Sequence, residues 1–285
     1  MVYLLIDMGY LLFYRYHATK LWFKKAHDYK DDISMAETQA FQTTFKSRIE
    51  SCIEKIIKQY KTDWSQVIFC RDSRRENIWR NQLYKPYKQN RDNSSLTGLK
   101  IAVNLLKLAI FRLIRYNNAK CIGLQGAEAD DIVYCLVKRI NKYESGHNII
   151  IVTSDQDYYQ LLNTNVTMVG LDTKDKTSKA IQNRDDISQD IKKIIVDKKL
   201  DYRQLNLLVK IIIGDKSDNL PSCFPKCGFK TAVKLAIDPN SLDNMFKKIP
   251  SSKDIFNLNK KMIDMSMIPK KLQDKINYKI DIALY

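Results

Sequence analysis

The sequence lacks the features of a membrane or secreted protein. It has no run of about 18 consecutive apolar residues, the length that a helix needs to span a bilayer. Residues Met1 to Asp7 contain no basic stretch, and their apolar run is too short for a signal peptide. We therefore expect an intracellular protein with no membrane partner.

Histidine is scarce and the cysteines are not arranged for metal binding. The three histidines are isolated, and we assign them no catalytic role. Cys223 and Cys227 have no second Cys or His pair nearby, so the sequence does not predict a zinc site. Free thiols without a secretion signal are typical of a reducing, intracellular setting.

Positive charge is what the chain has in excess. Its 285 residues carry a net charge of +16, and 45% of them are hydrophobic. That length suits one sizeable domain or two small ones with a real core. The charge indicates a polyanionic partner, most simply nucleic acid. A coding bias towards lysine, asparagine and isoleucine would also raise the charge, so the charge alone does not decide.

Short apolar runs predict the strands of a sheet. The candidates are Tyr3–Ile6, Val67–Cys70 and Ile149–Val152, with Cys121–Leu124 and Val166–Val169 as weaker ones. Helical patterns lie between them, at Ala36–Tyr60, Lys100–Arg115 and Ala129–Lys142. Strands that alternate with helices indicate an α/β fold, with a mostly parallel central sheet and helices on both faces.

Carboxylates stand where these predicted strands end, and further ones open a predicted helix near the same edge. They are Asp7, Asp72, Asp155 and Asp157 after strands, and Glu128, Asp130 and Asp131 within Gly126–Asp131. Acidic residues at a helix start are ordinary, because that end carries partial positive charge. In parallel sheets, however, the functional crevice lies beyond the carboxyl ends of the strands. The recurrence of acids at that edge therefore predicts one acidic site.

Such a site needs cations, because neighbouring carboxylates repel and raise each other's pKa. Ligands that are all oxygen, with no His or Cys among them, suit a hard ion such as Mg²⁺ or Mn²⁺. The number of acids exceeds what one ion needs and so indicates two. Two ions roughly 4 Å apart can promote hydrolysis of a phosphodiester.

Basic and aromatic residues interleave in segment 74–98, which follows Asp72 and has no clean helical or strand period. Its basic residues are Arg74, Arg75, Arg80, Lys85, Lys88 and Arg91, and its aromatic ones include Trp79, Tyr84 and Tyr87. This mixture suits single-stranded nucleic acid, with charges on the backbone and rings on the bases. The alternative is a solvated connection without a binding role.

Segment Tyr10–Lys25 has a similar composition. Its aromatic residues, which include Trp22 and Phe23, suit contact with the base pair at the end of a duplex. They suit burial in the core equally well, so both interpretations stay open.

A helical hairpin is predicted at 205–236. Leu205–Ile213 has helical apolar spacing and ends at Gly214, and a second helical stretch runs from Phe229 to Ala236. The backbone N–H groups of the glycine-containing loop between them can hold a phosphate and grip a duplex without reading sequence. The candidates for DNA contact are Lys216, Lys226, Gly228, Lys230 and Thr231. The alternative is an ordinary helical hairpin.

The chain divides into two predicted regions, a sheet domain at 1–185 and a helical region at 186–285. Asp215 and Asp218 lie three residues apart in the helical region and could join the acidic site. Within Thr173–Lys199 only Ile187–Val196 looks helical. Asp238–Tyr285 is lysine-rich, and we expect it to pack as short helices over the hairpin.

In these residues the chain resembles the structure-specific 5′-nuclease family, which includes flap endonucleases and phage-type 5′–3′ exonucleases. The matching blocks, in order, are Asp72, Tyr87–Arg91, Gly126–Asp131, Thr153–Asp157 and Gly214–Asn219. The resemblance extends over nearly the whole length, from Ile6 to Ala232. Several blocks in the right order make it specific.

The resemblance implies a PIN-like or resolvase-like nuclease core, an arch at 74–98 and a helix–three-turn–helix element within the hairpin. The first implied metal cluster is Asp7, Asp72, Glu128, Asp130 and Asp131. The second is Asp155, Asp157, Asp215 and Asp218. Lys88 and Arg91 match the arch residues that contact the scissile phosphate. The implied cofactors are two Mg²⁺ ions, for which Mn²⁺ can substitute, and a K⁺ ion at the hairpin.

One position departs from the family pattern. The hairpin loop of the family usually carries two glycines, and this chain has Lys226 in place of the first and keeps Gly228. Lysine resists backbone conformations that glycine accepts, so the K⁺ site and the grip on phosphate depend on how Lys226 is accommodated. No polymerase domain follows, which is expected of a free-standing nuclease.

Together these features predict a monomeric, Mg²⁺-dependent 5′ nuclease for replication and repair. Its expected substrate is branched or flapped DNA with a 5′ single strand, and removal of RNA primers from RNA-primed DNA is a further expected activity. One alternative is a non-catalytic DNA-binding replication or recombination factor on the same fold, which would be favoured by loss of several acids. Another is a PIN-type ribonuclease, which needs neither arch nor hairpin.

Overall fold

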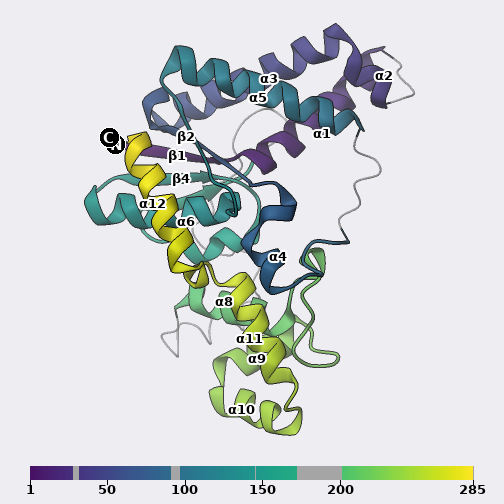
Figure 1. Ribbon diagram of the computed structural model, residues 1–285, viewed down its shortest axis with the longest axis vertical. Coiled ribbons are helices and arrows are strands. Elements are labelled where there is room, and N and C mark those ends of the chain that lie inside the picture. Colours follow the sequence, from purple (N-terminus) through teal and green to yellow (C-terminus); the bar gives the residue numbers. More distant parts are fainter. Residues whose placement is uncertain (28–31, 91–96, 145, 172–200, 285) are drawn as a thin grey trace.

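A computed structural model describes residues 1–27, 32–90, 97–144, 146–171 and 201–284. Within this part of the chain, strands form one sheet with helices on both faces, and a smaller helical lobe lies below these layers in the view of Figure 1. The predicted α/β fold with a helical C-terminal region is confirmed. None of the described helices is long and apolar enough to cross a bilayer.

The sheet is parallel throughout and has the strand order β3-β2-β1-β4-β5. The strands are β1 (Val2–Asp7), β2 (Val67–Arg71), β3 (Lys120–Gly123), β4 (Asn148–Val152) and β5 (Val166–Val169). All five predicted runs are therefore strands. The chain builds one half of the sheet outward from β1 and then returns to the other side of β1 to build the second half. This reversal places the expected crevice at the carboxyl ends of β1 and β4.

The central strand shows why these runs fold as buried strands. Leu4, Leu5 and Ile6 are fully buried. Leu4 and Ile6 pack into the hydrophobic cluster on one face of the sheet, whereas Leu5 packs into the cluster on the other. A strand covered on both faces has no polar side, which explains its continuous apolar run.

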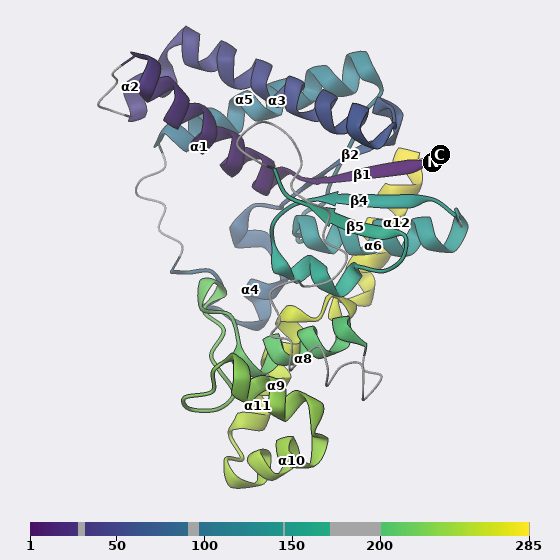
Figure 2. The same cartoon turned by 180° about the vertical axis from the view of Figure 1, so that it is seen from behind.

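One face of the sheet is covered by the helices that precede and follow β2. They are α1 (Met8–His27), α2 (Asp32–Glu37), α3 (Gln39–Tyr60) and α5 (Thr97–Asn117), and Figure 2 shows them as one layer. The single helix predicted at Ala36–Tyr60 is divided in two. The division occurs at Thr38, whose side chain accepts a hydrogen bond from the Phe41 amide and caps α3.

Helix α1 was missing from the predicted elements because it is apolar on more than one side. Tyr16 and Phe23 are buried in the core, whereas Phe13 and Trp22 are about half exposed. Burial in the core is therefore confirmed for Tyr16 and Phe23, whereas contact of the exposed rings with a base pair stays a prediction.

The opposite face is covered by α6 (Ala129–Tyr143), the short helix η3 (Gln156–Leu161) and α12 (Lys270–Leu284). Figure 1 shows α12 running alongside α6. The prediction that the end of the chain packs over the hairpin is wrong for α12. Its Ile276 and Ile280 lie one turn apart and form an apolar ridge that is fully buried against the sheet domain.

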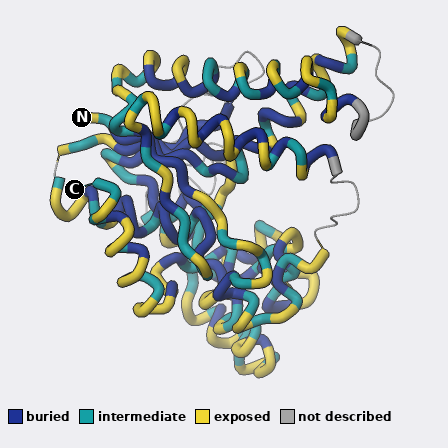
Figure 3. Tube along the Cα trace, turned by 45° about the horizontal axis from the view of Figure 1, so that its top comes forward, coloured by how far each residue is buried: buried dark blue, intermediate teal, exposed yellow. Residues whose placement is uncertain are grey.

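The smaller lobe has its own hydrophobic cluster. Figure 3 shows buried residues within this lobe. Its helices are α8 (Tyr202–Ile213), α9 (Phe229–Ile237), α10 (Pro239–Lys248) and α11 (Ser252–Ile263). The predicted hairpin is formed by α8 and α9. The boundary placed at residue 185 and the helix expected at Ile187–Val196 lie outside the described residues.

Short helices complete the described chain. They are η1 (Trp64–Gln66), η2 (Arg75–Asn77), α4 (Trp79–Leu83), η4 (Lys216–Asp218) and η5 (Met265–Met267). Two of them, η2 and α4, form part of segment 74–98, for which no regular structure was predicted. Residues 91–96 of that segment lie outside the described part.

We expect Phe69→Ala to lower the free energy of unfolding by about 3–5 kcal/mol, because Phe69 of β2 is fully buried and its removal leaves a cavity. Phe111→Ala is the matched control: Phe111 of α5 is 60% exposed, and its loss should change stability by about 0.5 kcal/mol or less. Urea unfolding followed by circular dichroism measures both. Equal effects of the two substitutions would contradict the burial described here.

Candidate metal centre and nucleic-acid interface

The carboxyl ends of the central strands bring the predicted acids to one cavity of about 540 Å³. Eight of the nine candidate ligands line it: Asp7, Asp72, Glu128, Asp130, Asp155, Asp157, Asp215 and Asp218. The expected convergence is therefore observed, and it includes the two acids of the helical lobe. Ligation of a metal by these residues stays a prediction.

Asp7 and Asp72 are held close together at the ends of β1 and β2. Asp7 accepts hydrogen bonds from the Tyr10 amide and the Tyr158 hydroxyl, each at 3.0 Å. A Cβ on Gly9 would lie 3.1 Å from Asp72 Oδ2 and 3.3 Å from Asp7 Oδ1, so glycine leaves room for both carboxylates. Burial, with repulsion from Asp72, raises the pKa of Asp7 to about 7.

The Gly126–Asp131 segment divides its acids between two tasks. Glu128 and Asp130 face the cavity, but Asp131 does not line it and is fully buried. Asp131 accepts hydrogen bonds at 2.9 Å from the Glu128 amide and the Trp79 indole. Glu128 in turn caps α6, so the two side chains form a reciprocal capping box. Asp131, predicted as a ligand, instead fixes the helix end that presents the other two acids.

Arg80 is the counter-ion of this group. Its guanidinium lies 2.8 Å from Glu128, 3.0 Å from Asp131 and 3.3 Å from Asp130. Its Nε donates to the Met262 carbonyl of α11 at 2.9 Å. Arg80 was predicted to contact DNA, but its side chain is 2% exposed, so this assignment is wrong. The delocalised fork of arginine suits a buried site with several acceptors.

Tyr87 and Lys88 approach Glu128 from the other side. The Tyr87 hydroxyl donates to Glu128 at 3.1 Å, and Lys88 Nζ lies 2.5 Å from the same carboxylate. Tyr87 is only 3% exposed, so its predicted stacking on bases is wrong as well. Lys88 lines the cavity, as expected of a residue that contacts the scissile phosphate. The predicted partner Arg91 lies outside the described residues.

The charges explain how these acids respond to burial. Burial alone would raise the pKa of Glu128, but the positive charges of Lys88 and Arg80 lower it below its ordinary value. Asp130 behaves differently: burial, reinforced by its acidic neighbours, raises its pKa well above the usual range despite Arg80. In the metal-free protein the nearby cations therefore outweigh the effect of burial on the pKa of Glu128, but they do not outweigh it for Asp130.

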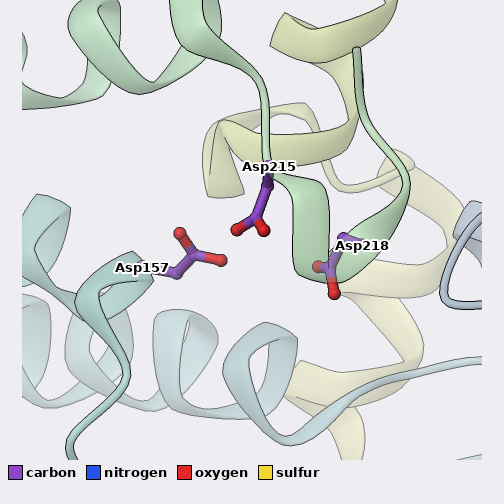
Figure 4. A group of neighbouring side chains, drawn as sticks. All are labelled: Asp157, Asp215 and Asp218. Carbon is purple, nitrogen blue, oxygen red and sulfur yellow. The ribbon is translucent and has the colours of Figure 1, made fainter. Parts of the chain in front are cut away.

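A second acidic group stands across the cavity. Figure 4 shows Asp157, Asp215 and Asp218 gathered at one place, and one carboxylate oxygen of each lies within 4.8 Å of the other two. Asp157 follows β4 on η3, whereas the other two belong to the loop after α8. Asp155 caps η3, where it accepts from the Asp157 amide at 2.9 Å. The group therefore joins the sheet domain to the helical lobe.

Lys210 is the site residue that the sequence interpretation missed. Its ammonium group forms an ion pair with Asp157 and lies 3.0 Å from Asp215. Burial opposes its charge, but the two carboxylates raise its pKa above the ordinary value. The available signal was a single lysine within the apolar stretch Leu205–Ile213 of α8.

Residues 84–90 link the two halves of the site. Tyr84 donates to the Asn219 carbonyl at 3.2 Å, and Asn219 donates back to the Pro86 carbonyl at 2.8 Å. The Lys88 amide donates to the Asp218 carbonyl at 3.2 Å. Lys88 and Asn219 both adopt positive φ, near 55° and 60°, conformations that side chains other than glycine rarely adopt. Such strain is retained where the surrounding contacts enforce it.

Comparison with known proteins decides the family. Residues 2–192 match the family described as "5'-3' exonuclease, N-terminal resolvase-like domain". The chain belongs to this 5′–3′ exonuclease family. The match includes the segments of β1, β2, α6 and β4 that carry Asp7, Asp72, Glu128 and Asp155, whereas Asp215 lies outside it.

Several known proteins are similar to this one over most of the chain. A 5′–3′ exonuclease of Buchnera aphidicola subsp. Acyrthosiphon pisum is 28% identical over 229 residues, which are 80% of this chain and 72% of that protein. A second, from Buchnera aphidicola subsp. Baizongia pistaciae, is 30% identical over 66% of this chain and 55% of its own length. DNA polymerase I of Caldicellulosiruptor bescii is 28% identical over 70% of this chain, which corresponds to 22% of the polymerase.

Solved structures share the fold over the full length. A bacteriophage T5 D15 protein crystallised with metal ions superposes with a TM-score of 0.69 at 17% identity, and all of both chains is covered. A T5 D15 flap endonuclease in a complex with DNA and metal ions gives 0.65 at 15% identity, again over both whole chains. At these identities the likeness concerns the fold, including the helical lobe.

Lys226, the one departure from the expected two-glycine loop, adopts a backbone conformation typical of glycine. Lys226 has φ near 54°, in the left-handed region that glycine adopts most easily. Gly228 precedes the first residue of α9 and caps it. The residues predicted to contact DNA here are all exposed, namely Lys216, Lys226, Gly228, Lys230 and Thr231.

The remaining DNA-contact candidates of segment 74–98 vary in exposure. Arg74 and Lys85 are exposed, and Arg75 is half-buried. Tyr84 is half-buried, and its hydrogen bond to the Asn219 carbonyl connects segment 74–98 to the helical lobe. Arg74, Arg75 and Lys85 therefore stay candidates for contact with a nucleic-acid backbone.

We expect Arg80→Ala to lower the free energy of unfolding of the metal-free protein by about 3–5 kcal/mol, because it leaves three buried carboxylates without their cation. Arg74→Ala, at an exposed arginine, is the control and should cost about 0.5 kcal/mol or less. Urea unfolding with a chelator present measures both. A small loss for Arg80→Ala would show that the carboxylates do not need this cation.

The raised pKa of Asp7 predicts a pH dependence of metal-free stability. The pKa of an aspartate in an unfolded chain is about 3.9, whereas the pKa of Asp7 in the folded chain is about 7. The folded state then binds the proton more tightly, so the contribution of Asp7 is complete below about pH 4 and is lost as pH rises through 7. Asp7→Asn cannot ionise and should lack this loss.

The measurement is urea unfolding at a series of pH values, with chelator, for wild type and Asp7→Asn. The variant should gain stability relative to wild type as pH rises from about 4 to 7. Asp254→Asn, at an exposed residue of α11, should follow the wild-type curve. A constant difference between Asp7→Asn and wild type over that range would disprove the predicted titration.

Proposed function

We propose that this chain is a divalent-metal-dependent 5′ nuclease that hydrolyses phosphodiesters where a 5′ single strand meets duplex DNA. The observation that carries the proposal is the single cavity lined by eight carboxylates in a member of the 5′–3′ exonuclease family. Similarity to DNA polymerase I proteins supports work in DNA replication and repair, and hence inside the cell.

The donor set of the cavity fits Mg²⁺, or Mn²⁺ in its place. All the carboxylates offer oxygen, and no His or Cys is among the described residues that line the cavity. Asp7, Asp72, Glu128 and Asp130 would hold one ion, and Asp155, Asp157, Asp215 and Asp218 the other. Bound there, such ions stabilise charge on phosphoryl oxygens and lower the pKa of water.

The chain's own cations have defined tasks in this proposal. Arg80 and Tyr87 are buried and keep Glu128 in place. Lys88 and Lys210 line the cavity and are charged groups within reach of a phosphate that enters it. Lys88 and Lys210 would turn their ammonium groups to the scissile phosphodiester once the acids that they contact serve as metal ligands. Such preorganised charge stabilises the negative charge that develops during hydrolysis.

The surface beside the cavity supports a junction substrate. The exposed loop and first turn of α9 carry Lys226, Lys230 and Thr231, which suit the backbone of a duplex. Phe13 of α1 is 48% exposed and lines the metal-site cavity, where it can contact the last base pair. The glycine-like conformation of Lys226 supports a K⁺ site at this loop. We further propose that the protein acts as a monomer and that it also cleaves RNA-primed DNA.

Asp157→Asn should reduce cleavage of a 5′-flap DNA in Mg²⁺ by about 100-fold or more, because it removes a ligand from the second acidic group. Asp254→Asn should cleave at the wild-type rate. Gel analysis of end-labelled flap, gap, nicked and RNA-primed duplexes measures rate and cleavage position together. If Asp157→Asn cleaves as fast as wild type, the assigned site is wrong.

Two further readouts separate the alternatives. Calorimetric titration with Mg²⁺ should show binding that Asp157→Asn weakens, whereas a non-catalytic DNA-binding factor would show none that depends on carboxylates. Wild type should cleave the DNA flap in preference to single-stranded RNA. The opposite preference would identify a PIN-type ribonuclease instead.

A further inference from the structure

A second cavity, of about 730 Å³, adjoins the metal-site cavity. Gly9 and Asp72 line both cavities, so the two meet at the ends of β1 and β2. The second cavity is otherwise formed by the chain after β2, the chain after β3 and one side of α5. We call it the basic groove, because Arg71, Arg74 and Lys107 line it.

The basic groove and the metal-site cavity differ in how their cations are used. Arg80, Lys88 and Lys210 of the metal-site cavity are all paired with carboxylates. In the described part of the chain, the three cations of the groove form no ion pair. All three are exposed, and Asp72 is the only carboxylate among the described residues that line the groove. The groove therefore presents positive charge to a ligand that the metal-site cavity can also reach.

The position of Arg71 is built into the sheet edge. A Cβ on Gly123 would lie 2.7 Å from Arg71 Nε and 3.1 Å from its Nη2. Glycine at this point of β3 leaves room for the guanidinium over the neighbouring strand, and a larger residue would displace it. Arg71 pairs with Gly123 in the β2–β3 register, so the two positions are fixed relative to each other.

The positive surface continues from the groove onto α12. Leu124, directly after β3, lines both the groove and a shallower cavity on α12. The shallower cavity is lined by Lys271, Lys275 and Lys279, which follow one another at intervals of one turn, and by Tyr278, which is 66% exposed. Its one acid, Asp274, is met by Lys270 at 2.8 Å.

These features form one track that starts at the metal-site cavity. Its chemistry is unpaired Lys and Arg with an exposed aromatic ring, which suits a single strand of nucleic acid: the charges bind phosphates and the ring stacks on a base. The track curves around the edge strand β3, because α5 and α12 contact β3 from opposite faces. A flexible single strand can follow that curve, whereas a stiff duplex cannot.

Resting on the proposed function, we propose that the 5′ single strand of the substrate leaves the metal site along the basic groove and continues over Leu124 onto the lysines of α12. The track then determines how strongly the enzyme binds a long 5′ single strand. A 5′ flap of one nucleotide is too short to reach the track, so cleavage of a substrate with such a flap does not depend on these residues.

Two double variants test the track, Arg71→Gln/Lys107→Gln in the groove and Lys275→Gln/Lys279→Gln on α12. Each should raise KM for a duplex with a long oligothymidine 5′ flap by about tenfold and leave kcat unchanged. KM for a single-nucleotide flap should stay at the wild-type value. The matched control is Lys46→Gln/Lys58→Gln on α3, which removes two charges outside the track.

A binding measurement makes the test independent of cleavage. Fluorescence anisotropy with free labelled oligothymidine should show weaker binding for both track variants. The slope of log Kd against the logarithm of the salt concentration should decrease by about 0.7 for each lost phosphate contact. Thermal unfolding verifies that the track variants, which are altered at exposed positions, and the α3 control remain folded. Wild type that binds through the track but cleaves no flap would refute the proposed function alone. Track variants that match the α3 control for long flaps and free oligothymidine would overturn the track.

Discussion

The crowding of carboxylates around one cavity is the constraint on which the rest of the structure depends. Eight acids cannot remain ionised in a partly buried site without nearby positive charge, since burial and mutual repulsion both raise their pKa values. The chain supplies Arg80, Lys88 and Lys210 for this purpose. Each of these side chains lies close to two or more carboxylates, and all of its carboxylate partners shown here are distant in the sequence or belong to another element.

The same ion pairs hold the two lobes together. Arg80 belongs to α4, its carboxylate partners open α6, and its carbonyl acceptor Met262 belongs to α11. Lys210 of α8 reaches across to Asp157 beside the sheet. The interface between sheet domain and hairpin lobe is therefore also the site. Its geometry is set by these polar contacts together with a hydrophobic cluster in which Ile78 and Tyr87 pack against Ile211, Leu220, Met262 and Ile263 of the helical lobe.

Charge is partitioned between the metal-site cavity and the surfaces beside it. Inside the cavity cations are matched by acids, and what remains to be neutralised is a surplus of carboxylates, which suits metal ions. Outside it, the groove at Arg71 and the loop at Lys226 carry exposed cations that pair with no carboxylate of the described residues. A nucleic acid can therefore be held by its backbone on the surface while one phosphate enters an acidic centre, which it reaches only together with metal.

The parallel sheet, the hairpin and the convergence of acids could all be predicted from the amino-acid sequence. A short, continuous apolar run such as Ile149–Val152 is typical of a buried strand. The residues that follow parallel strands lie together at one edge of the sheet. The role of each charged residue, in contrast, depends on the folded arrangement. Arg80 and Lys85 have the same sequence context of basic and aromatic neighbours, yet one is buried among carboxylates and the other is exposed. Burial and pairing depend on contacts between distant segments, such as Arg80 with Asp130 and Lys210 with Asp157, which no local pattern encodes.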